Sequence, residues 1–253
     1  MGKIIKVSDE IFDKQLEQLP KEVTFCKKCV ISNQRPRIRW GLKEDGVCSA
    51  CDYAYEKDNE IDWDKRERQL QKVCDEHRST NGSWDVIVPS SGGKDSGMVA
   101  HKLKYKYGMH PLTITWAPFI YTEIGWKNFI ALKDKGFDNI LVHPDGILHR
   151  KLSLLAFDLH GDAWDPFGYG QQYLAYHLSV KYNIPLIFFG ENGEIEYGGE
   201  DKHKNMVEAP MEDWEEIFYK GSSAQKLVDA GLKRNIFTKE EIASSSFDFY
   251  QPP

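Results

Sequence analysis

The sequence lacks any run of about 18 or more apolar residues, and its first residues, 1–9, contain two lysines but no apolar signal-peptide segment. We therefore expect a cytoplasmic protein that does not span a membrane. An excess of basic charge is also lacking, since 33 Lys and Arg residues stand against 39 Asp and Glu residues, a net charge of −6. Proteins that bind nucleic acid more often carry an excess of Lys and Arg, so this balance disfavours such a partner without excluding a local basic patch.

Cysteine is scarce, with five residues, but four of them form two Cys-x-x-Cys pairs. In a cytoplasmic protein this spacing indicates a metal site rather than disulfides. The pairs Cys26/Cys29 and Cys48/Cys51 can each hold one side of a tetrahedral zinc ion, as in a zinc ribbon. Four thiolates leave no open coordination position, so the expected role is structural. The fifth cysteine, Cys74, lies in an expected helix, and we interpret it as a packing residue.

A chain of 253 residues, with 41% hydrophobic and 28% charged residues, is long enough for one large domain and a small appendage. We expect an N-terminal helix and the cysteine module over residues 1–60, a linking helix over 61–83 and the main domain over 84–253. The Asn-Gly-Ser sequence at 81–83 ends the linking helix.

The main domain begins with a strand, a glycine loop and a helix start. The loop residues with candidate roles are Ser90, Ser91, Gly92, Gly93, Lys94, Asp95 and Ser96. Adjacent glycines let backbone N–H groups approach an anion, and the helix start adds N–H groups and a favourable dipole. The stretch therefore predicts a phosphate or pyrophosphate site. It is not a Walker A loop, because Asp95 follows the lysine and Val88 stands where that motif has its first glycine.

Strands and helices alternate from there on. The expected strands cover residues 85–89, 112–116, 139–142 and 186–189, and helices are expected before Gly108, before Gly136 and over 148–159, 171–182 and 224–230. This order predicts an α/β fold with a doubly wound parallel sheet, whose ligands bind beyond the carboxyl ends of the strands. Thr115 and Trp116 stand at such an end and could supply backbone contacts and an apolar wall to an adenine, although Trp116 can equally be a core residue.

An acidic, glycine-rich stretch follows the fourth expected strand. Its candidate residues are Gly190, Glu191, Asn192, Glu194, Glu196 and Tyr197. The carboxylates could hold Mg²⁺ beside a phosphate, bind the polar part of a second substrate, or form a solvated surface loop. Asp95, inside the phosphate loop, is the better candidate for Mg²⁺.

A second polar stretch, over residues 158–170, is rich in aromatic, acidic and glycine residues, as sugar and nucleotide pockets often are. His160 is the one histidine that we consider for proton transfer. The alternative is that His160 is an ordinary solvent-exposed histidine, which is the more common case.

The string Ser91-Gly92-Gly93-Lys94-Asp95-Ser96 resembles the SGGxDS loop of the PP-loop ATP pyrophosphatases, which have an adenine nucleotide α-hydrolase-like fold. These enzymes cleave ATP between the α and β phosphates while activating a C=O oxygen. The order of the Cys₄ module, this loop and Gly-Glu-Asn-x-Glu-x-Glu-Tyr-Gly-Gly is similar to that of the N-acetyl sugar amidotransferases, synthetase subunits of bacterial surface-polysaccharide (lipopolysaccharide O-antigen) or nonulosonic-acid pathways. The resemblance covers roughly residues 25–253, and family members usually continue past the Tyr-x-Pro-Pro that ends this chain, so we expect a shortened chain.

This resemblance implies an ATP-dependent ligase that converts the acetamido group of a nucleotide-linked sugar into an acetamidino group, with release of AMP and pyrophosphate. The serines and glycines of the loop would bind the pyrophosphate, Lys94 would stabilise charge, and Asp95 would hold Mg²⁺. None of the five cysteines lies in a glutaminase signature such as Gly-x-Cys-x-Gly. The resemblance therefore also implies a separate class I glutaminase as the partner that supplies ammonia.

Two other functions remain open. A PP-loop tRNA-modifying enzyme of the thiolation type would use a cysteine after the loop and a basic RNA surface, whereas no cysteine follows Cys74 and the net charge is −6. A non-catalytic nucleotide-binding module is the second alternative, and the motif-complete phosphate loop disfavours it.

Overall fold

The computed structural model describes residues 20–35, 38–191, 194–197, 204, 206, 219 and 222–253. The chain forms two compact units, Met1–Asp62 with Asn192–Glu208, and Trp63–Glu191 with Ala209–Pro253. We call them the cysteine unit and the sheet unit. This division differs from the expected one, in which residues 61–83 form a separate linker and all of 84–253 form the main domain.

The cysteine unit is built around short backbone contacts rather than long elements. Antiparallel bridges join Phe25 to Ser32 and Trp40 to Cys48, as expected for knuckles joined by a hairpin. Helix α1 (Ser49–Asn59) follows the last of these, and the 3₁₀ turn η1 (Glu194–Tyr197) packs against it. The expected helix before Pro20 lies outside the described residues.

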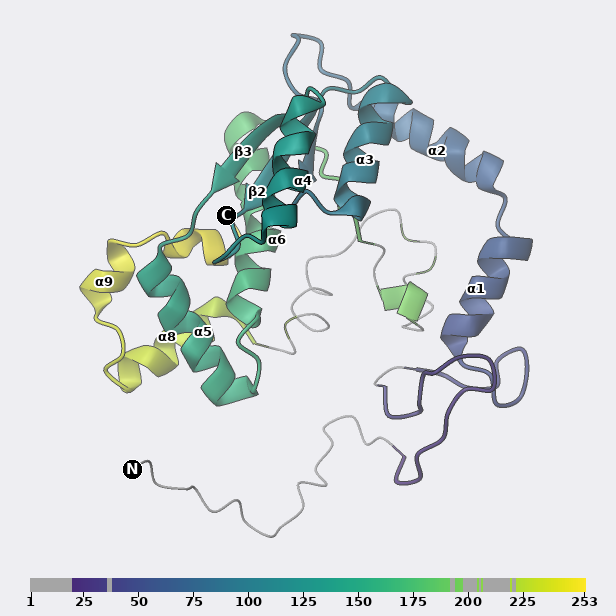
Figure 1. The fold of residues 1–253 in the computed structure, drawn as a ribbon, viewed down its shortest axis with the longest axis horizontal. Helices are drawn as coiled ribbons and strands as arrows, with labels where there is room; N and C mark the ends of the chain where they lie inside the picture. Colours follow the sequence, from purple (N-terminus) through teal and green to yellow (C-terminus); the bar gives the residue numbers. More distant parts are fainter. Residues whose placement is uncertain are drawn as a thin grey trace. The chain divides into compact units, whose positions relative to one another are not determined.

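The sheet unit contains the alternating strands and helices (Figure 1). Its elements are α2 (Trp63–Glu76), β1 (Val86–Pro89), α3 (Lys94–Tyr105), β2 (Pro111–Trp116), α4 (Glu123–Asp134), β3 (Asp138–Val142), α5 (Gly146–His160), α6 (Asp165–Tyr182), α8 (Ala224–Lys233), α9 (Lys239–Ala243) and the 3₁₀ turn η4 (Phe247–Tyr250). Within the described part of the chain, no helix is both long and apolar enough to cross a membrane.

The three strands form a parallel sheet in the order β1-β2-β3. The expected fourth strand is present only as a parallel bridge between Ile187 and Ile87, with hydrogen bonds of 2.9 Å from Ile87 N to Leu186 O and from Phe188 N to Ile87 O. The N–H and the C=O of Ile87 point to the same side of β1, and both bond to the segment 186–188. This segment therefore lies along the edge of β1 that faces away from β2. The chain passes from β1 to β2 and β3 on one side and returns to the other side of β1 with the segment 186–188. Such a reversal of strand order is where α/β sheets bind ligands. A fully doubly wound sheet stays a prediction.

Apolar side chains cover both faces of β1, because neighbouring residues of a strand point to opposite faces. Val86 and Val88 belong to one buried cluster with Ala100 of α3, and Ile87 belongs to another with residues of α5, α6 and α8. Both layers are needed to bury a strand that is apolar throughout. This packing fixes the carboxyl end of β1 between the two helical layers.

Helix α6 begins at Asp165, six residues before the expected start at 171. Pro166 occupies the first turn, where its fixed φ and missing N–H are compatible with a helix. In the sequence, Gly168 and Gly170 interrupt the apolar pattern of a helix. In the structure, Phe167, Tyr169 and Gly170 are buried. Much of the polar stretch over 158–170 is therefore helical.

Candidate functional site

The phosphate loop connects β1 to α3 in the strand-loop-helix context that the motif requires. Gly92 has φ of +83°, a backbone conformation that favours glycine. Gly93 precedes the first residue of α3 without forming a side-chain cap, so no side chain of the cap position covers the N–H groups of the first turn. An anion can accept those hydrogen bonds and is favoured by the helix dipole.

Serine hydroxyls hold the loop in this shape. The Oγ atoms of Ser90 and Ser96 are 3.2 Å apart, and the Gly92 N–H donates to Ser90 Oγ over 3.4 Å. The Gly93 N–H donates to Ser91 Oγ over 3.3 Å. Ser90 and Ser96 are buried, whereas Ser91 is exposed, so Ser91 is the serine of the loop most open to a ligand.

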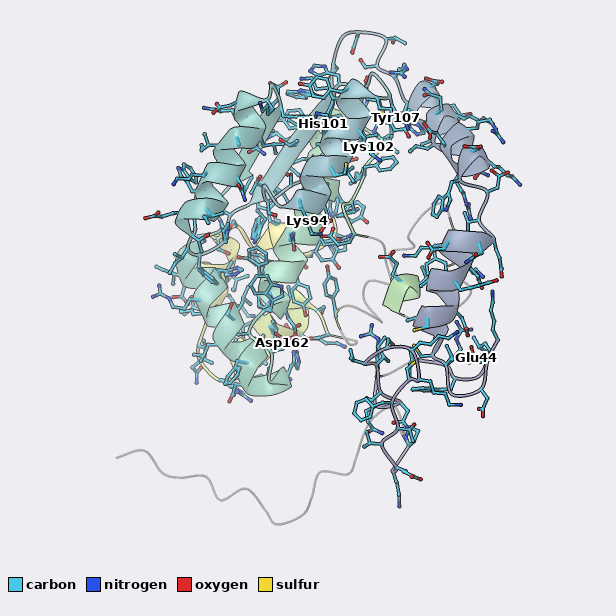
Figure 2. The ribbon with its side chains drawn as sticks, turned by 45° about the vertical axis from the view of Figure 1, so that its right-hand side comes forward. Glu44, Lys94, His101, Lys102, Tyr107 and Asp162 are labelled. Carbon is cyan, nitrogen blue, oxygen red and sulfur yellow. The ribbon has the colours of Figure 1, made fainter. Side chains whose placement is uncertain are left out.

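Lys94, labelled in Figure 2, and Asp95 are the first two residues of α3. Their side chains are 87% and 62% exposed, and Lys94 Nζ lies 2.7 Å from both carboxylate oxygens of Asp95. Both side chains can therefore reorient toward a bound phosphate. The assignment of Mg²⁺ to Asp95 stays a prediction.

Gly190 brings a second backbone segment against the loop. A Cβ atom at Gly190 would lie 2.8 Å from Ser96 N and 3.0 Å from Ser96 Cα, which is closer than packed atoms approach. Because Gly190 has no side chain, the backbone that follows Ile187 can contact the first turn of α3. Gly190 and Glu191 thus lie beside the phosphate loop.

The rest of the acidic stretch belongs to the cysteine unit. Glu196 lies in η1 and pairs with Lys57 of α1, with 2.6 Å between Nζ and Oε1. Asn192 lies outside the described residues, as do the side chains of Glu194 and Tyr197, although η1 includes the backbone of both. Their predicted roles toward Mg²⁺ or a second substrate stay predictions.

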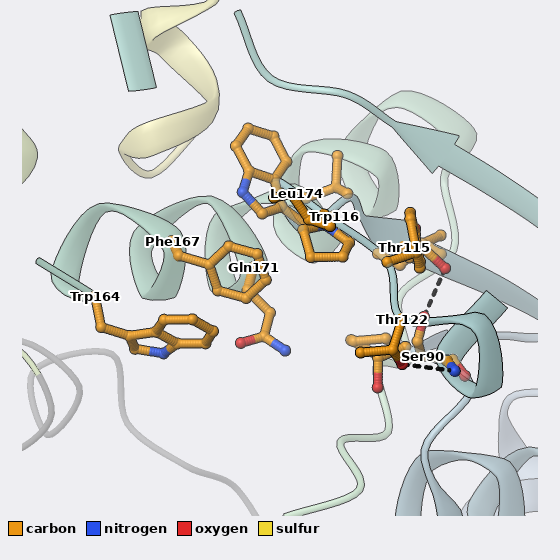
Figure 3. Close-up of a pocket in the computed structure, with 15 residues that line it drawn as sticks. Ser90, Thr115, Trp116, Thr122, Trp164, Phe167, Gln171 and Leu174 are labelled. Atoms are coloured by element: carbon orange, nitrogen blue, oxygen red, sulfur yellow. Dashed lines mark hydrogen bonds between the residues drawn. The ribbon is translucent and has the colours of Figure 1, made fainter. Parts of the chain in front are cut away.

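One side of the phosphate loop opens into a cavity of about 350 Å³, shown in Figure 3. We call it the neutral cavity. Its lining includes Thr115, Trp116, Tyr121, Thr122, Phe167 and Leu174. No Asp, Glu, Lys, Arg or His is among the described residues that line it. Aromatic and hydroxyl groups without charge suit a flat, neutral heterocycle such as adenine.

Thr115 and Trp116 line this cavity, but each also has a structural role. The Thr115 hydroxyl donates to Ser90 O over 2.5 Å and accepts from Asn139 Nδ2 over 3.0 Å, so it clamps the end of β1 (Figure 3). Trp116 is buried in the core, and a Cβ at Gly170 would lie 2.2 Å from its ring. Trp116 is therefore both a core residue and a cavity wall.

A second cavity, of about 290 Å³, adjoins the loop at Ser91 and Ser96. We call it the acidic cavity. It shares Pro89, Ser91, Trp164 and Gln171 with the neutral cavity. Its other lining residues include Ser96, Asp162, Asp165, Gln172, Phe189, Glu191 and Tyr219. Three of these are carboxylates, and no Lys, Arg or His is among the described lining residues.

His160 stands behind the acidic cavity. Its Nδ1 lies 3.2 Å from Asp165 Oδ2 and its Nε2 lies 3.4 Å from Ser222 Oγ. The His160 side chain is only 28% exposed and that of Asp165 only 6%. His160 therefore pairs with a buried carboxylate and is nevertheless an exposed residue, as the more common alternative has it.

Sequence reasoning missed Asp162, Asp165, Gln171 and Gln172 as individual site residues. It had noted only the composition of the stretch that contains them. A signal was present, because one turn of helix after Pro166 places Gln171 and Gln172 near the same end of α6 as Asp165. Recognising it required knowing that α6 starts so early.

The four paired cysteines come together in the cysteine unit. Their sulfurs all lie within 4.8 Å of one another, with 3.9 Å between those of Cys26 and Cys51 and 3.6 Å between those of Cys29 and Cys48. Zinc bonds of about 2.3 Å in a tetrahedron place the sulfurs about 3.8 Å apart. The geometry therefore fits one zinc ion bound by four thiolates.

Backbone N–H groups favour the thiolate form of Cys26, whereas burial raises the pKa of the Cys48 and Cys51 thiols. Lys28 N and Cys48 N donate to Cys26 Sγ over 3.3 and 3.4 Å. Burial raises the pKa of the Cys26 thiol, but the backbone donors outweigh it and lower the pKa to about 6. A thiolate is the form that binds zinc.

Comparison with known proteins leaves the family of the chain open. No protein-family model matches the chain, and no curated protein matches it. One solved structure that is similar to it is described as an NH3-dependent NAD synthetase from Campylobacter jejuni subsp. jejuni NCTC 11168 in complex with the nitrate ion. It is 18% identical, with a TM-score of 0.40, over 72% of this chain and 91% of that chain. At this similarity the activity of that synthetase is not carried over to the chain.

Proposed function

We propose that the protein is an ATP-dependent, AMP-forming amidotransferase of the PP-loop type. Its substrate would be the acetamido group of a nucleotide-linked N-acetyl sugar, and its product an acetamidino group. The observation that carries the proposal is the phosphate loop at the carboxyl end of β1, whose Ser91 lines both a neutral and an acidic cavity. Such an arrangement offers separate places for a nucleotide and for the group that it activates.

The neutral cavity would take adenosine, because its lining is aromatic and hydroxylic and carries no charge. The triphosphate would then reach the N–H groups of the loop and of the first turn of α3. Lys94 would turn toward the phosphates, since its side chain is 87% exposed. Asp95 would hold Mg²⁺, whose charge would offset that of the leaving pyrophosphate.

The reaction needs no nucleophilic side chain. The amide oxygen forms a bond to the α phosphorus, and the bond to the bridging oxygen breaks, so that pyrophosphate leaves with the electron pair. Ammonia then adds its lone pair to the amide carbon, and the carbon–oxygen bond breaks with its electron pair on AMP. The added nitrogen loses one proton, which leaves an amidinium cation. The protein contributes by holding the amide oxygen in line with the α phosphate and by neutralising charge.

The nitrogen would come from a separate class I glutaminase. The remaining cysteine, Cys74, is fully buried, and burial raises the pKa of its thiol, so it is a poor nucleophile for releasing ammonia from glutamine. The same burial disfavours the thiolation alternative, which would need a reactive cysteine. The partner and the cytoplasmic location stay predictions.

The test supplies ATP, Mg²⁺, ammonium and a UDP-linked acetamido sugar whose carbonyl carries a heavy oxygen isotope. We expect pyrophosphate release, a sugar in which oxygen is replaced by NH, and the heavy isotope in AMP. Asp158→Asn is a matched control, because this carboxylate of α5 pairs with Arg234 and lines neither cavity. If ATP is not split with any amide sugar, the proposal is wrong, and tRNA binding that weakens with salt would favour the thiolation alternative.

A further inference from the structure

We infer that Gln171 of α6 aligns the two substrates, because its amide oxygen binds the N–H of the acceptor amide while its amide nitrogen binds the α phosphate. This inference rests on the proposed function, since it assigns a further residue to the reaction of the same site. Gln171 lies outside the phosphate loop and outside the acidic stretch after residue 190. The basis is the position of this one polar side chain in an apolar stripe of α6.

The wall that α6 gives to the neutral cavity is apolar except at one position. The residues that form it are Trp164, directly before the helix, and Phe167, Gln171 and Leu174 within it. Their spacings of three and four residues place them on one face of the helix. Figure 3 shows the Gln171 amide pointing into the space beside Trp164 and Phe167. The stripe therefore presents a single amide to whatever occupies the cavity.

Two adjacent glutamines of α6 differ in their hydrogen-bond partners. Gln172 is buried, and its Nε2 donates to Tyr176 Oη over 3.2 Å. Gln171 is exposed, and none of the residues that the structure describes forms a hydrogen bond with its amide. Gln172 therefore serves the packing of the helix, whereas Gln171 offers both a donor and an acceptor to a ligand.

Gln171 also lies where the two cavities meet. The described residues that line both cavities are Pro89, Ser91, Trp164 and Gln171. With adenosine in the neutral cavity and the acceptor in the acidic cavity, the α phosphate and the amide oxygen meet beside these residues. Ser91 Oγ already accepts from the Gly93 N–H, and the Trp164 indole can only donate. In Gln171 the donor and the acceptor are separate atoms, so this side chain can reach two substrates at once.

Helix α6 holds Gln171 in a fixed place relative to the phosphate loop. The helix packs against β1 and β2, and Leu174 is buried in the same core cluster as Ile87 of β1. The phosphate loop begins where β1 ends. A side chain on a packed helix is positioned more precisely than one on a loop, which favours a role in aligning substrates.

The chemistry strengthens the contact with the acceptor during the reaction. When the amide oxygen bonds to the α phosphorus and pyrophosphate leaves with the electron pair, the amide nitrogen keeps its proton and shares the positive charge that develops. Its N–H then donates more strongly to Gln171 Oε1 than in the neutral amide, so the contact favours the transition state over the ground state. Gln171 Nε2 donates to an oxygen of the α phosphate and keeps the phosphorus in line with the amide oxygen. The site therefore selects acceptors whose amide carries an N–H.

The first experiment measures binding without turnover, by calorimetric titration of the full chain with a UDP-linked acetamido sugar. The nucleotide is α,β-methylene-ATP with Mg²⁺, which cannot release pyrophosphate because carbon replaces the bridging oxygen. We expect this nucleotide to raise the affinity for the sugar at least about fivefold in wild type and less than about twofold in Gln171→Leu. The reason is that the first ligand orients the Gln171 amide for the second.

Gln225→Leu is the matched control for this titration. Gln225 lies in α8, its Nε2 donates to Asp229, and it lines neither cavity. This variant makes the same change of side chain at a site without a role in binding. It should therefore keep the wild-type coupling between nucleotide and sugar.

The second experiment uses the proposed reaction. We expect Gln171→Leu to lower kcat at least about tenfold while the KM for ATP and the Tm stay unchanged, because the contact is strongest in the transition state and the side chain is exposed. A residue that only supports the scaffold would instead lower the Tm or raise the KM for ATP.

The outcomes separate this inference from the proposed function. If wild type releases no pyrophosphate with any amide sugar, the proposed function is wrong and the inference falls with it. If wild type is active but shows no coupling, or if Gln171→Leu keeps the coupling or the kcat of wild type, only the inference is overturned. Gln171 would then be an ordinary solvated glutamine.

Discussion

Replacing Gly92 by alanine should destabilise the sheet unit through two costs that the structure specifies. A side chain at φ of +83° costs about 1 to 2 kcal/mol. The new Cβ would also lie 2.8 Å from Phe129 N and 2.9 Å from Phe129 Cα. These are backbone atoms of α4, which cannot rotate away, and such overpacking costs about 1 to 3 kcal/mol.

A smaller term opposes these costs, because alanine reduces the freedom of the unfolded chain by about 0.4 to 1 kcal/mol. The expected net loss for Gly92→Ala is therefore about 3 kcal/mol, or about 6 to 12 °C in Tm for a chain of this size. Affinity for ATP should fall as well, because the N–H groups of the loop would move. Thermal unfolding and an ATP titration measure the two effects.

Gly97→Ala is the matched control. Gly97 lies in α3, and a Cβ there meets nothing within 4 Å. Alanine is the better helix former by about 0.5 to 1 kcal/mol, so this variant should be more stable than wild type and bind ATP normally. If Gly92→Ala proved as stable as Gly97→Ala, the close packing of the loop against α4 would be refuted.

Three further outcomes are expected. Elemental analysis should find one zinc ion per wild-type chain. Cys48→Ser should lose this zinc and expose the cysteine unit to protease, whereas Cys74→Ala should retain the metal; zinc retained in Cys48→Ser would contradict the four-cysteine site. Asp95→Ala should abolish pyrophosphate release without lowering Tm, since its side chain is 62% exposed, and unchanged turnover would remove Asp95 from the site. Burial lowers the pKa of His149 to about 4, below its unfolded value of 6.5. The contribution of neutral His149 to the free energy of unfolding is therefore complete above pH 6.5 and is lost as the pH falls toward 4. Urea unfolding should therefore show a loss of about 3 kcal/mol over that interval, and His149→Phe should lack this component; an equal loss in both proteins would contradict the assignment.

Much of the fold could be read from the sequence because its signals are local. The strand before Ser90, the helix after Gly93 and the parallel order of β1 to β3 follow from apolar periodicity and glycine positions. The strand expected at 186–189 was reduced to one bridge, since its length depends on the neighbouring strand rather than on its own residues. The early start of α6 was missed because its first two turns carry a proline and two glycines, which usually indicate loops.

The sequence by itself indicated the glycine loop as an anion site and four cysteines as candidate metal ligands, because the spacing of residues within one short stretch limits what its backbone and side chains can bind. Only the tertiary structure decided that a neutral and an acidic cavity both adjoin that loop at Ser91. It also brought His160 to Ser222, 62 residues away in the chain, and so fixed Asp165. Such contacts depend on how helices far apart in sequence pack against one sheet, and no local pattern encodes them.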